Sequence, residues 1–291
     1  MSMIESFEYS FKGDAVRVPV AIAGDVSSNK APTLIIPGWG VRGQERIAEI
    51  ADLYANTGRF GIVRVVEMPN QIARKNGARA LLQAYPEVAN IARSKMEDEF
   101  HLEPHSMGML AVNDELDPVT AVVVAGLFPQ ISYKTKQSAR EHQKMRKLGV
   151  RFGVIESMTE GGRMRAAGDS FGTMMNAGAY SLKDARNFVS HPFELIRTLA
   201  VEAQSVATIS NMASRGTKVG FVHGANDPVF PFDEINLQVP QLTGDPQYYD
   251  SNVILMEAPA NGHPGLIGNI GKIIAGNVAD MQDRLIADLA A

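Results

Sequence analysis

The stretch Glu99–Val112, EFHLEPHSMGMLAV, joins a short apolar run to a segment that is typical of a helix. The apolar run ends at Pro104, Ser106 follows two positions later, and Gly108 opens the helical segment. This order predicts a strand, a tight turn and a helix, with Ser106 on the turn. A serine at such a junction either caps the helix with its hydroxyl or is a nucleophile held on a strained turn.

Segments with strand and helix patterns alternate on both sides of this stretch. Short apolar runs occur at residues 33–37, 61–67, 100–104, 119–129, 218–224 and 252–259. Apolar residues recur at helical spacing at Ile47, Ile50, Ala51 and Tyr54, over residues 78–93, and at Ile274, Val278, Met281 and Leu285. Strands that alternate with helices predict a parallel sheet that is covered by helices on both faces.

An antiparallel element is expected before the parallel sheet. Residues 7–11 and 16–24, FEYSF and VRVPVAIAG, are alternating β-rich runs on either side of the short turn KGD. This pattern predicts a β-hairpin. We therefore expect an α/β protein with a mostly parallel sheet, helices on both faces and an N-terminal β-hairpin.

The alternation of strands and helices fails over residues 130–195. This segment contains five of the methionines, Met145, Met158, Met164, Met174 and Met175. We interpret it as a cap or lid insertion at the edge of the sheet where ligands bind, with residues 1–129 and 196–291 forming the core. Met174 and Met175 are candidates for an apolar substrate pocket, because methionine adapts to varied ligands, although a plain helical core is the alternative.

Composition excludes several classes of function. The chain has 291 residues and no cysteine, so disulfides, thiolate catalysis and cysteine zinc sites are excluded. A net charge of -4 shows no basic excess for nucleic acid. No targeting segment or membrane-length apolar run is evident, so a cytoplasmic protein without a membrane span is expected. No P-loop, zinc or calcium pattern occurs, so neither a cofactor nor a metal is expected, and the oligomeric state stays open.

Three reactive side chains follow three separate predicted strands. Ser106, Asp227 and His263 each come shortly after a strand, and residues beyond the carboxyl ends of parallel strands can converge in space. A hydroxyl needs an imidazole to take its proton, and the imidazole needs a carboxylate to orient it. The sequence therefore predicts a Ser-Asp-His triad, with Asp233 as the reserve acid.

Four segments carry a resemblance to a known family. APTLIIPGWG, HSMG, VHGANDPVFP and NGHPGL, in this order, resemble the α/β-hydrolase family over most of the chain outside the methionine-rich insertion. The resemblance implies that Ser106 is the nucleophile, Asp227 the acid and His263 the base. It also implies that the backbone amides of Trp39 and Met107 form the oxyanion hole.

The sequence departs from the family pattern at two prolines. Pro104 stands where the serine turn usually has its first glycine, and Pro37 stands where a histidine is common. The function implied by the resemblance is a serine hydrolase that cleaves a carboxylic ester or a related acyl bond of a small molecule. An alternative is a non-catalytic binding protein on the same sheet, in which the turn at Pro104 does not present the serine.

A second alternative is a dinucleotide-binding enzyme. Residues 38–43, GWGVRG, match the pattern GxGxxG, follow a predicted strand and precede a predicted helix. Glu67 ends the next strand, about 24 residues further on, where a ribose-binding acid would stand. This interpretation leaves the predicted triad unexplained.

Overall fold

The computed structural model describes residues 2–38, 41, 43–69, 71–72, 76, 80–96, 99–124, 205–224, 253–256 and 268–290. The strands are β1 (Met3–Phe11), β2 (Asp14–Ala23), β3 (Thr33–Ile36), β4 (Val63–Val66), β5 (His101–Pro104), β6 (Thr120–Val124), β7 (Lys218–Gly224) and β8 (Val253–Met256). The helices are α1 (Gln44–Ala55), α3 (Leu81–Arg93), the 3-10 helix η2 (Ser106–Ala111), α8 (Ser205–Ser214) and α12 (Gly268–Ala290).

These strands form one sheet with the order β1-β2-β4-β3-β5-β6-β7-β8. The hairpin strands β1 and β2 pair antiparallel, and β2 also pairs antiparallel with β4. All pairs from β4 to β8 are parallel. The predicted α/β class, with a mostly parallel sheet and an N-terminal hairpin, is confirmed.

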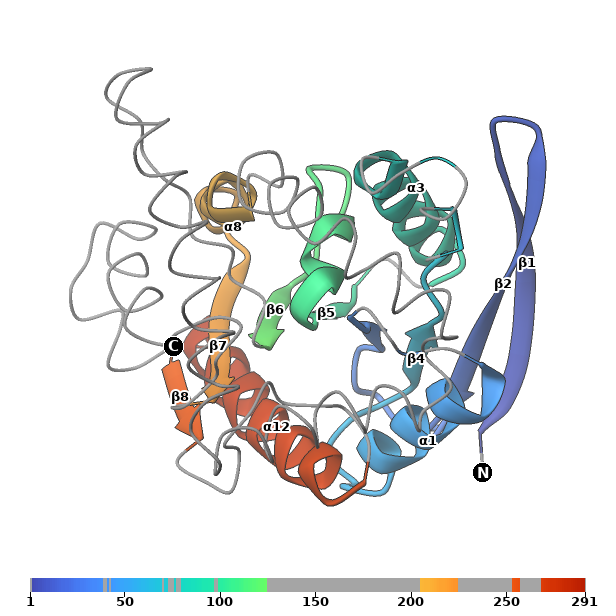
Figure 1. Ribbon diagram of the computed structural model, residues 1–291. Coiled ribbons are helices and arrows are strands. Elements are labelled where there is room, and N and C mark those ends of the chain that lie inside the picture. The colour runs from blue at the N-terminus through green and yellow to red at the C-terminus, as the bar shows by residue number, and fades with distance from the viewer. Residues whose placement is uncertain are drawn as a thin grey trace, which may run out of the picture.

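Helices cover both faces of the sheet. In Figure 1, α1 and α12 lie on one side of the strands, and α3 and α8 lie on the other. The side chains predicted to share one face of α1 are all fully buried, namely Ile47, Ile50, Ala51 and Tyr54. The same holds for α12, where Ile274, Val278, Met281 and Leu285 are at most 1% exposed. The helical periodicity in the sequence therefore marks the faces that pack on the sheet.

Helix α3 packs on the opposite face. Six of its residues are buried, namely Leu81, Ala84, Tyr85, Val88, Ala89 and Ala92. Pro86 lies inside this helix, where it removes one backbone hydrogen bond. Burial of the apolar face against β5 and its neighbours stabilises the helix despite that loss.

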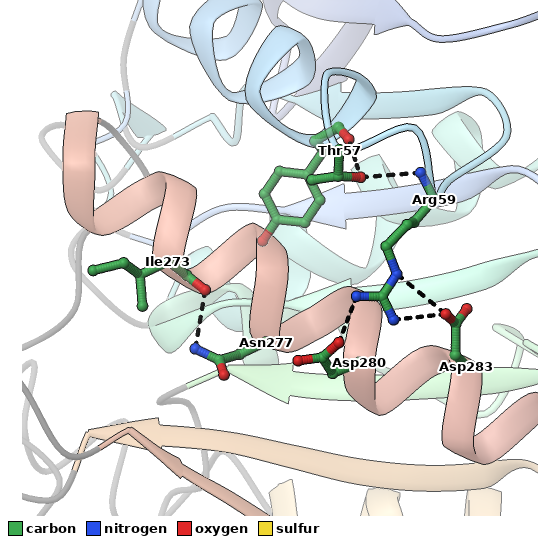
Figure 2. Close-up of polar contacts among 7 residues, drawn as sticks. Thr57, Arg59, Ile273, Asn277, Asp280 and Asp283 are labelled. Carbon is green, nitrogen blue, oxygen red and sulfur yellow. Dashed lines mark hydrogen bonds and ion pairs between the residues drawn. The ribbon is translucent and has the colours of Figure 1, made fainter.

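Helix α12 is tied to the loop between α1 and β4 by a charged cluster (Figure 2). The Arg59 guanidinium bonds to Asp280, and its Nη2 lies 2.6 Å from an Asp283 oxygen. Nε of Arg59 donates to the same Asp283 oxygen at 3.1 Å. Because these groups are about one third to one half exposed, each pair stabilises the contact by about 1 kcal/mol or less.

Among the helices in the described residues, none combines the length and the apolar character that a bilayer crossing requires. The predicted cap, residues 130–195, lies outside the described residues.

Candidate active site

The centre of the site is the turn that follows β5. This strand lies between β3 and β6 and is parallel to both. His105 continues it in an extended conformation, with φ of -109° and ψ of 125°, and forms a bridge with Val124. The amide of His105 donates to the Ile36 carbonyl at 2.9 Å. The residue before the serine is therefore still held as part of the sheet.

Ser106 has a φ of 50°, which lies in the left-handed region. A non-glycine residue pays on the order of 1 to 3 kcal/mol for such a conformation unless its surroundings enforce it. Ser106 is only 8% exposed, and the amide of Gly108 closes the turn by donating to the His105 carbonyl at 2.7 Å. The serine is thus on a sharp, strained turn.

The backbone geometry distinguishes a serine that caps the helix from a serine that is a nucleophile on a strained turn. An N-cap residue has an extended backbone, and here that position belongs to His105, not to Ser106. The helix itself differs from the expectation that it would open at Gly108. It begins at the serine as the six-residue 3-10 helix η2, because the turn is too tight for an α-helical first turn.

Two glycines allow this turn to lie against β3 and the residues after it. A Cβ on Gly108 would lie 2.0 Å from the carbonyl oxygen of Ile36. A Cβ on Gly38 would lie 2.8 Å from the Cβ of Ser106 and 3.2 Å from Nδ1 of His105. The start of the β3–α1 turn is therefore packed directly on the serine, and a side chain at either glycine would push them apart.

The other predicted triad residues lie outside the described residues, but the strands before them do not. β7 ends at Gly224, three residues before Asp227, and β8 ends at Met256, seven residues before His263. These strands are parallel to each other and to β6, so their carboxyl ends lie on the same edge of the sheet as Ser106. The three strands that precede the predicted triad residues thus end at one edge of the sheet.

The remaining predicted site residues have the same status. Trp39, Asp233, Met174 and Met175 lie outside the described residues, and the backbone of Met107 lies in η2. Their predicted roles in the oxyanion hole, as reserve acid and in the pocket stay predictions.

A buried acid near the serine was not singled out in the sequence. Glu103, in β5, is fully buried, and its Oε1 is hydrogen-bonded to the hydroxyl of Tyr54 in α1. Burial raises the pKa of Glu103 well above its ordinary value. The carboxyl therefore keeps its proton to a higher pH than an exposed glutamic acid would. The pKa of Tyr54 is also raised, mainly by burial and to a smaller extent by the negative charge of the nearby Glu103. An acid within the apolar run FHLEP was the signal in the sequence.

The side chain of His101 is buried and forms a hydrogen bond within the sheet. Its Nδ1 lies 2.8 Å from the hydroxyl oxygen of Thr120 on the neighbouring strand β6. Burial lowers the pKa of His101 to about 4, so the ring is neutral near pH 7. Within the described ranges, no group of three or more His, Asp or Glu side chains is placed to hold a metal ion.

The acid that the dinucleotide interpretation assigns to a ribose binds the protein instead. Oε2 of Glu67 accepts a hydrogen bond from the amide of Gly43 at 3.1 Å. In a dinucleotide site the glycine-rich turn and the acid would both face the ligand. Their direct bond therefore counts against that interpretation.

Sequence comparison finds no match, either to a family model or to a curated protein. Solved structures are similar in fold. A bromoperoxidase from Bacillus anthracis is 13% identical with a TM-score of 0.56, over 97% of this chain and 99% of that one. Est1E from Butyrivibrio proteoclasticus is 13% identical with a TM-score of 0.53, over 97% and 99%. MGS-M2, an alpha/beta hydrolase enzyme from a Medee basin deep-sea metagenome library, is 12% identical with a TM-score of 0.53, over 95% and 97%. At this identity the likeness concerns the fold.

Proposed function

We propose that this chain, which has the α/β-hydrolase fold, is a serine hydrolase that cleaves a carboxylic ester or a related acyl bond. The observation that carries the proposal is the φ of 50° at Ser106. That strained turn stands at the carboxyl end of a central parallel strand, where ligands bind in α/β sheets. Strain of this kind is typical of a nucleophile that must project from a sheet.

The proposed reaction has two halves. The Ser106 oxygen attacks the acyl carbon while His263 takes its proton, and Asp227 orients the imidazole and stabilises its charge. The tetrahedral intermediate expels the alcohol, which receives the proton from His263, and an acyl-serine is left. Water, activated by His263, then releases the acid and restores the serine.

Negative charge develops on the acyl oxygen in both halves. We assign its stabilisation to the amides of Met107 and Trp39. The close approach of Gly38 to Ser106 supports this assignment, because Gly38 directly precedes Trp39 in the sequence and a Cβ on it would lie 2.8 Å from the Ser106 Cβ. The raised pKa of Glu103 also supports it, since a carboxyl that resists ionisation three residues before the serine opposes an oxyanion less than a carboxylate would.

We assign the choice of substrate to the insertion at residues 130–195. Met174 and Met175 would line an apolar pocket for the acyl group, with the reacting bond at Ser106. Thioesters and lactones fit the same chemistry as esters, because each has an acyl carbon that a serine can attack.

The geometry of the turn at Ser106 is relevant to the alternative that the chain is a non-catalytic binding protein. That alternative requires that the turn altered by Pro104 does not present Ser106 correctly. In the structure Pro104 is the last residue of β5, opposite Ile36, and the turn after it is formed. Proline is tolerated at this position because the next amide, that of His105, still bonds to β3.

The test is a chain-length series of nitrophenyl esters, from acetate to decanoate, with an acyl thioester beside it. The wild-type chain should hydrolyse at least one member with an initial burst of about one nitrophenol per chain, and Ser106→Ala should lose this turnover. Ser94→Ala, which removes a hydroxyl at the end of α3, is the matched control and should behave as wild type. Turnover that persists in Ser106→Ala would refute the nucleophile.

A further inference from the structure

We propose that the outer edge of β1 pairs antiparallel with the same edge of a second copy of this chain, so that the two sheets join into one. Figure 1 shows β1 as the outermost strand at one edge of the sheet, beside β2. Three strands separate β1 from β5, which precedes Ser106. The interface therefore does not depend on the chemistry proposed for the serine.

The edge of β1 is long and regular. Its nine residues pair one to one with β2, from Met3 opposite Ile22 to Phe11 opposite Asp14, without a bulge. The strand contains neither proline nor lysine, two residues that commonly prevent an exposed edge from pairing. Within the described residues, β2 is the only strand that pairs with β1. Such an edge is a template for another strand.

A hydrogen bond of β2 shows which backbone groups of β1 point outward. Ser6 lies opposite Pro19, whose carbonyl accepts a hydrogen bond from the Glu67 amide at 3.0 Å. Because Glu67 directly follows β4, the Pro19 carbonyl points away from β1, and Ser6 and Pro19 are a non-hydrogen-bonded pair. The amide and carbonyl of Ser6 therefore point out of the sheet. The two kinds of pair alternate along antiparallel strands, so the same holds for the other even-numbered residues of β1, namely Ile4, Glu8 and Ser10.

Overlap and charge select the register of the pairing. When Ile4 lies opposite Ser10 of the second copy, and Ser6 opposite Glu8 of the second copy, every outward residue of β1 is paired. A shift by two residues in one direction would place the two Glu8 carboxylates directly opposite each other, which is unfavourable. A shift in the other direction would leave Ser10 beyond the start of the second copy's strand.

This register brings opposite charges together across the edge. Arg17 of β2 lies opposite Glu8 of its own chain, yet its Nε donates to the hydroxyl oxygen of Ser6 at 2.9 Å. In the part of the chain that the structure describes, the exposed Glu8 carboxylate takes part in no hydrogen bond or ion pair. Because Ser6 faces Glu8 of the second copy, the guanidinium that rests on Ser6 lies beside that carboxylate. The two-fold axis repeats the contact, so each dimer gains two ion pairs.

Sedimentation velocity of the full chain, from about 1 to 100 μM, tests this interface, and the wild-type chain should be a dimer at the upper end of the range. Ser6→Pro removes an outward amide and places a ring at the edge, while the hydrogen bonds between β1 and β2 remain. It should raise the dissociation constant of the dimer at least about 30-fold.

A charge exchange tests the register. Glu8→Arg and Arg17→Glu should each raise the dissociation constant about tenfold, because each places like charges across the interface. The double variant should restore it to within about threefold of wild type. Asp288→Arg, which alters an exposed carboxylate on α12, is the matched control for the change in net charge and should dimerise as wild type does.

Thermal unfolding checks that each edge variant is folded. If Ser6→Pro does not fold, the charge exchange decides. A monomeric wild-type chain, or a dimer whose dissociation constant is unchanged in the folded edge variants, would overturn the proposal while leaving the proposed function intact.

Discussion

Lys12 and Ser106 have the same φ of 50°, but they lie in very different parts of the molecule. Lys12 is exposed in the two-residue turn between β1 and β2, and the next residue, Gly13, also has a positive φ, of 85°. A Cβ on Gly13 would meet no atom within 4 Å. Two positive φ values in succession are what the twist of a tight hairpin requires.

At Ser106 the same dihedral is imposed by packing. The serine is buried, Gly108 lies against the Ile36 carbonyl of β3, and Gly38 lies against Ser106 and His105. The comparison teaches that a positive φ alone does not indicate a function. It becomes informative where distant parts of the chain enforce it at the carboxyl edge of a parallel sheet.

The largest expected effect tests whether the buried turn is catalytic. Asp227→Asn should keep the fold but lower kcat by up to about four orders of magnitude, because an amide favours the wrong imidazole tautomer and does not offset its charge. Steady-state turnover of the best ester measures it. Asp233→Asn is the control, and a large loss there with none at Asp227 would reassign the acid.

The second prediction contrasts glycines at the two turns. Gly108→Ala should lower the free energy of unfolding by about 3 kcal/mol or more, because its Cβ would clash with the Ile36 carbonyl oxygen. Gly13→Ala should cost only about 1 kcal/mol, from φ strain without a clash. Urea unfolding of both variants measures the difference. Equal losses would mean that packing does not enforce the buried turn.

The third prediction concerns the buried acid in the strand that leads to Ser106. The pKa of Glu103 is raised in the folded chain, so the unfolded chain releases this proton first as pH rises. Stability from this group is therefore present below its unfolded pKa and is lost above it, by up to about 1.4 kcal/mol per pH unit. Glu103→Gln should flatten the fall in stability as the pH rises above 4.5, the ordinary pKa of this carboxyl. An identical slope in both chains would show that Glu103 ionises in the fold.

The smallest effect is expected at the strand residue before the turn. Pro104→Gly should change kcat/KM by less than about tenfold, because the turn after it depends on Gly38 and Gly108. Stability should fall by roughly 0.5 to 1 kcal/mol, since glycine gives the unfolded chain more freedom. Thermal unfolding and ester turnover measure the two quantities. A gain of activity on this substitution would show that proline disables the natural turn.

Local patterns in the sequence predicted the elements of this fold. The spacing of Ile47, Ile50 and Tyr54 predicted the buried face of α1, and the apolar run before Pro104 predicted β5. The order of strands and helices predicted the parallel sheet. These features depend on residues close together in the chain, which is why a sequence pattern carries them.

The details at the serine depend on contacts between distant residues. The φ of Ser106 is enforced by Gly38 and Ile36, about 70 residues earlier, and no local pattern encodes that contact. The raised pKa of Glu103 likewise depends on its burial next to Tyr54, which is 49 residues away. Sequence could therefore predict that Ser106 is on a turn, but not that the turn is strained.

The most direct test of the central claim is the reaction of the chain with a fluorophosphonate probe, followed by peptide mapping. The account predicts fast labelling of one residue per chain, at Ser106, with labelling abolished in Ser106→Ala and unchanged in Lys12→Ala. A wild-type chain that stays unlabelled, or that is labelled at another residue, would contradict it.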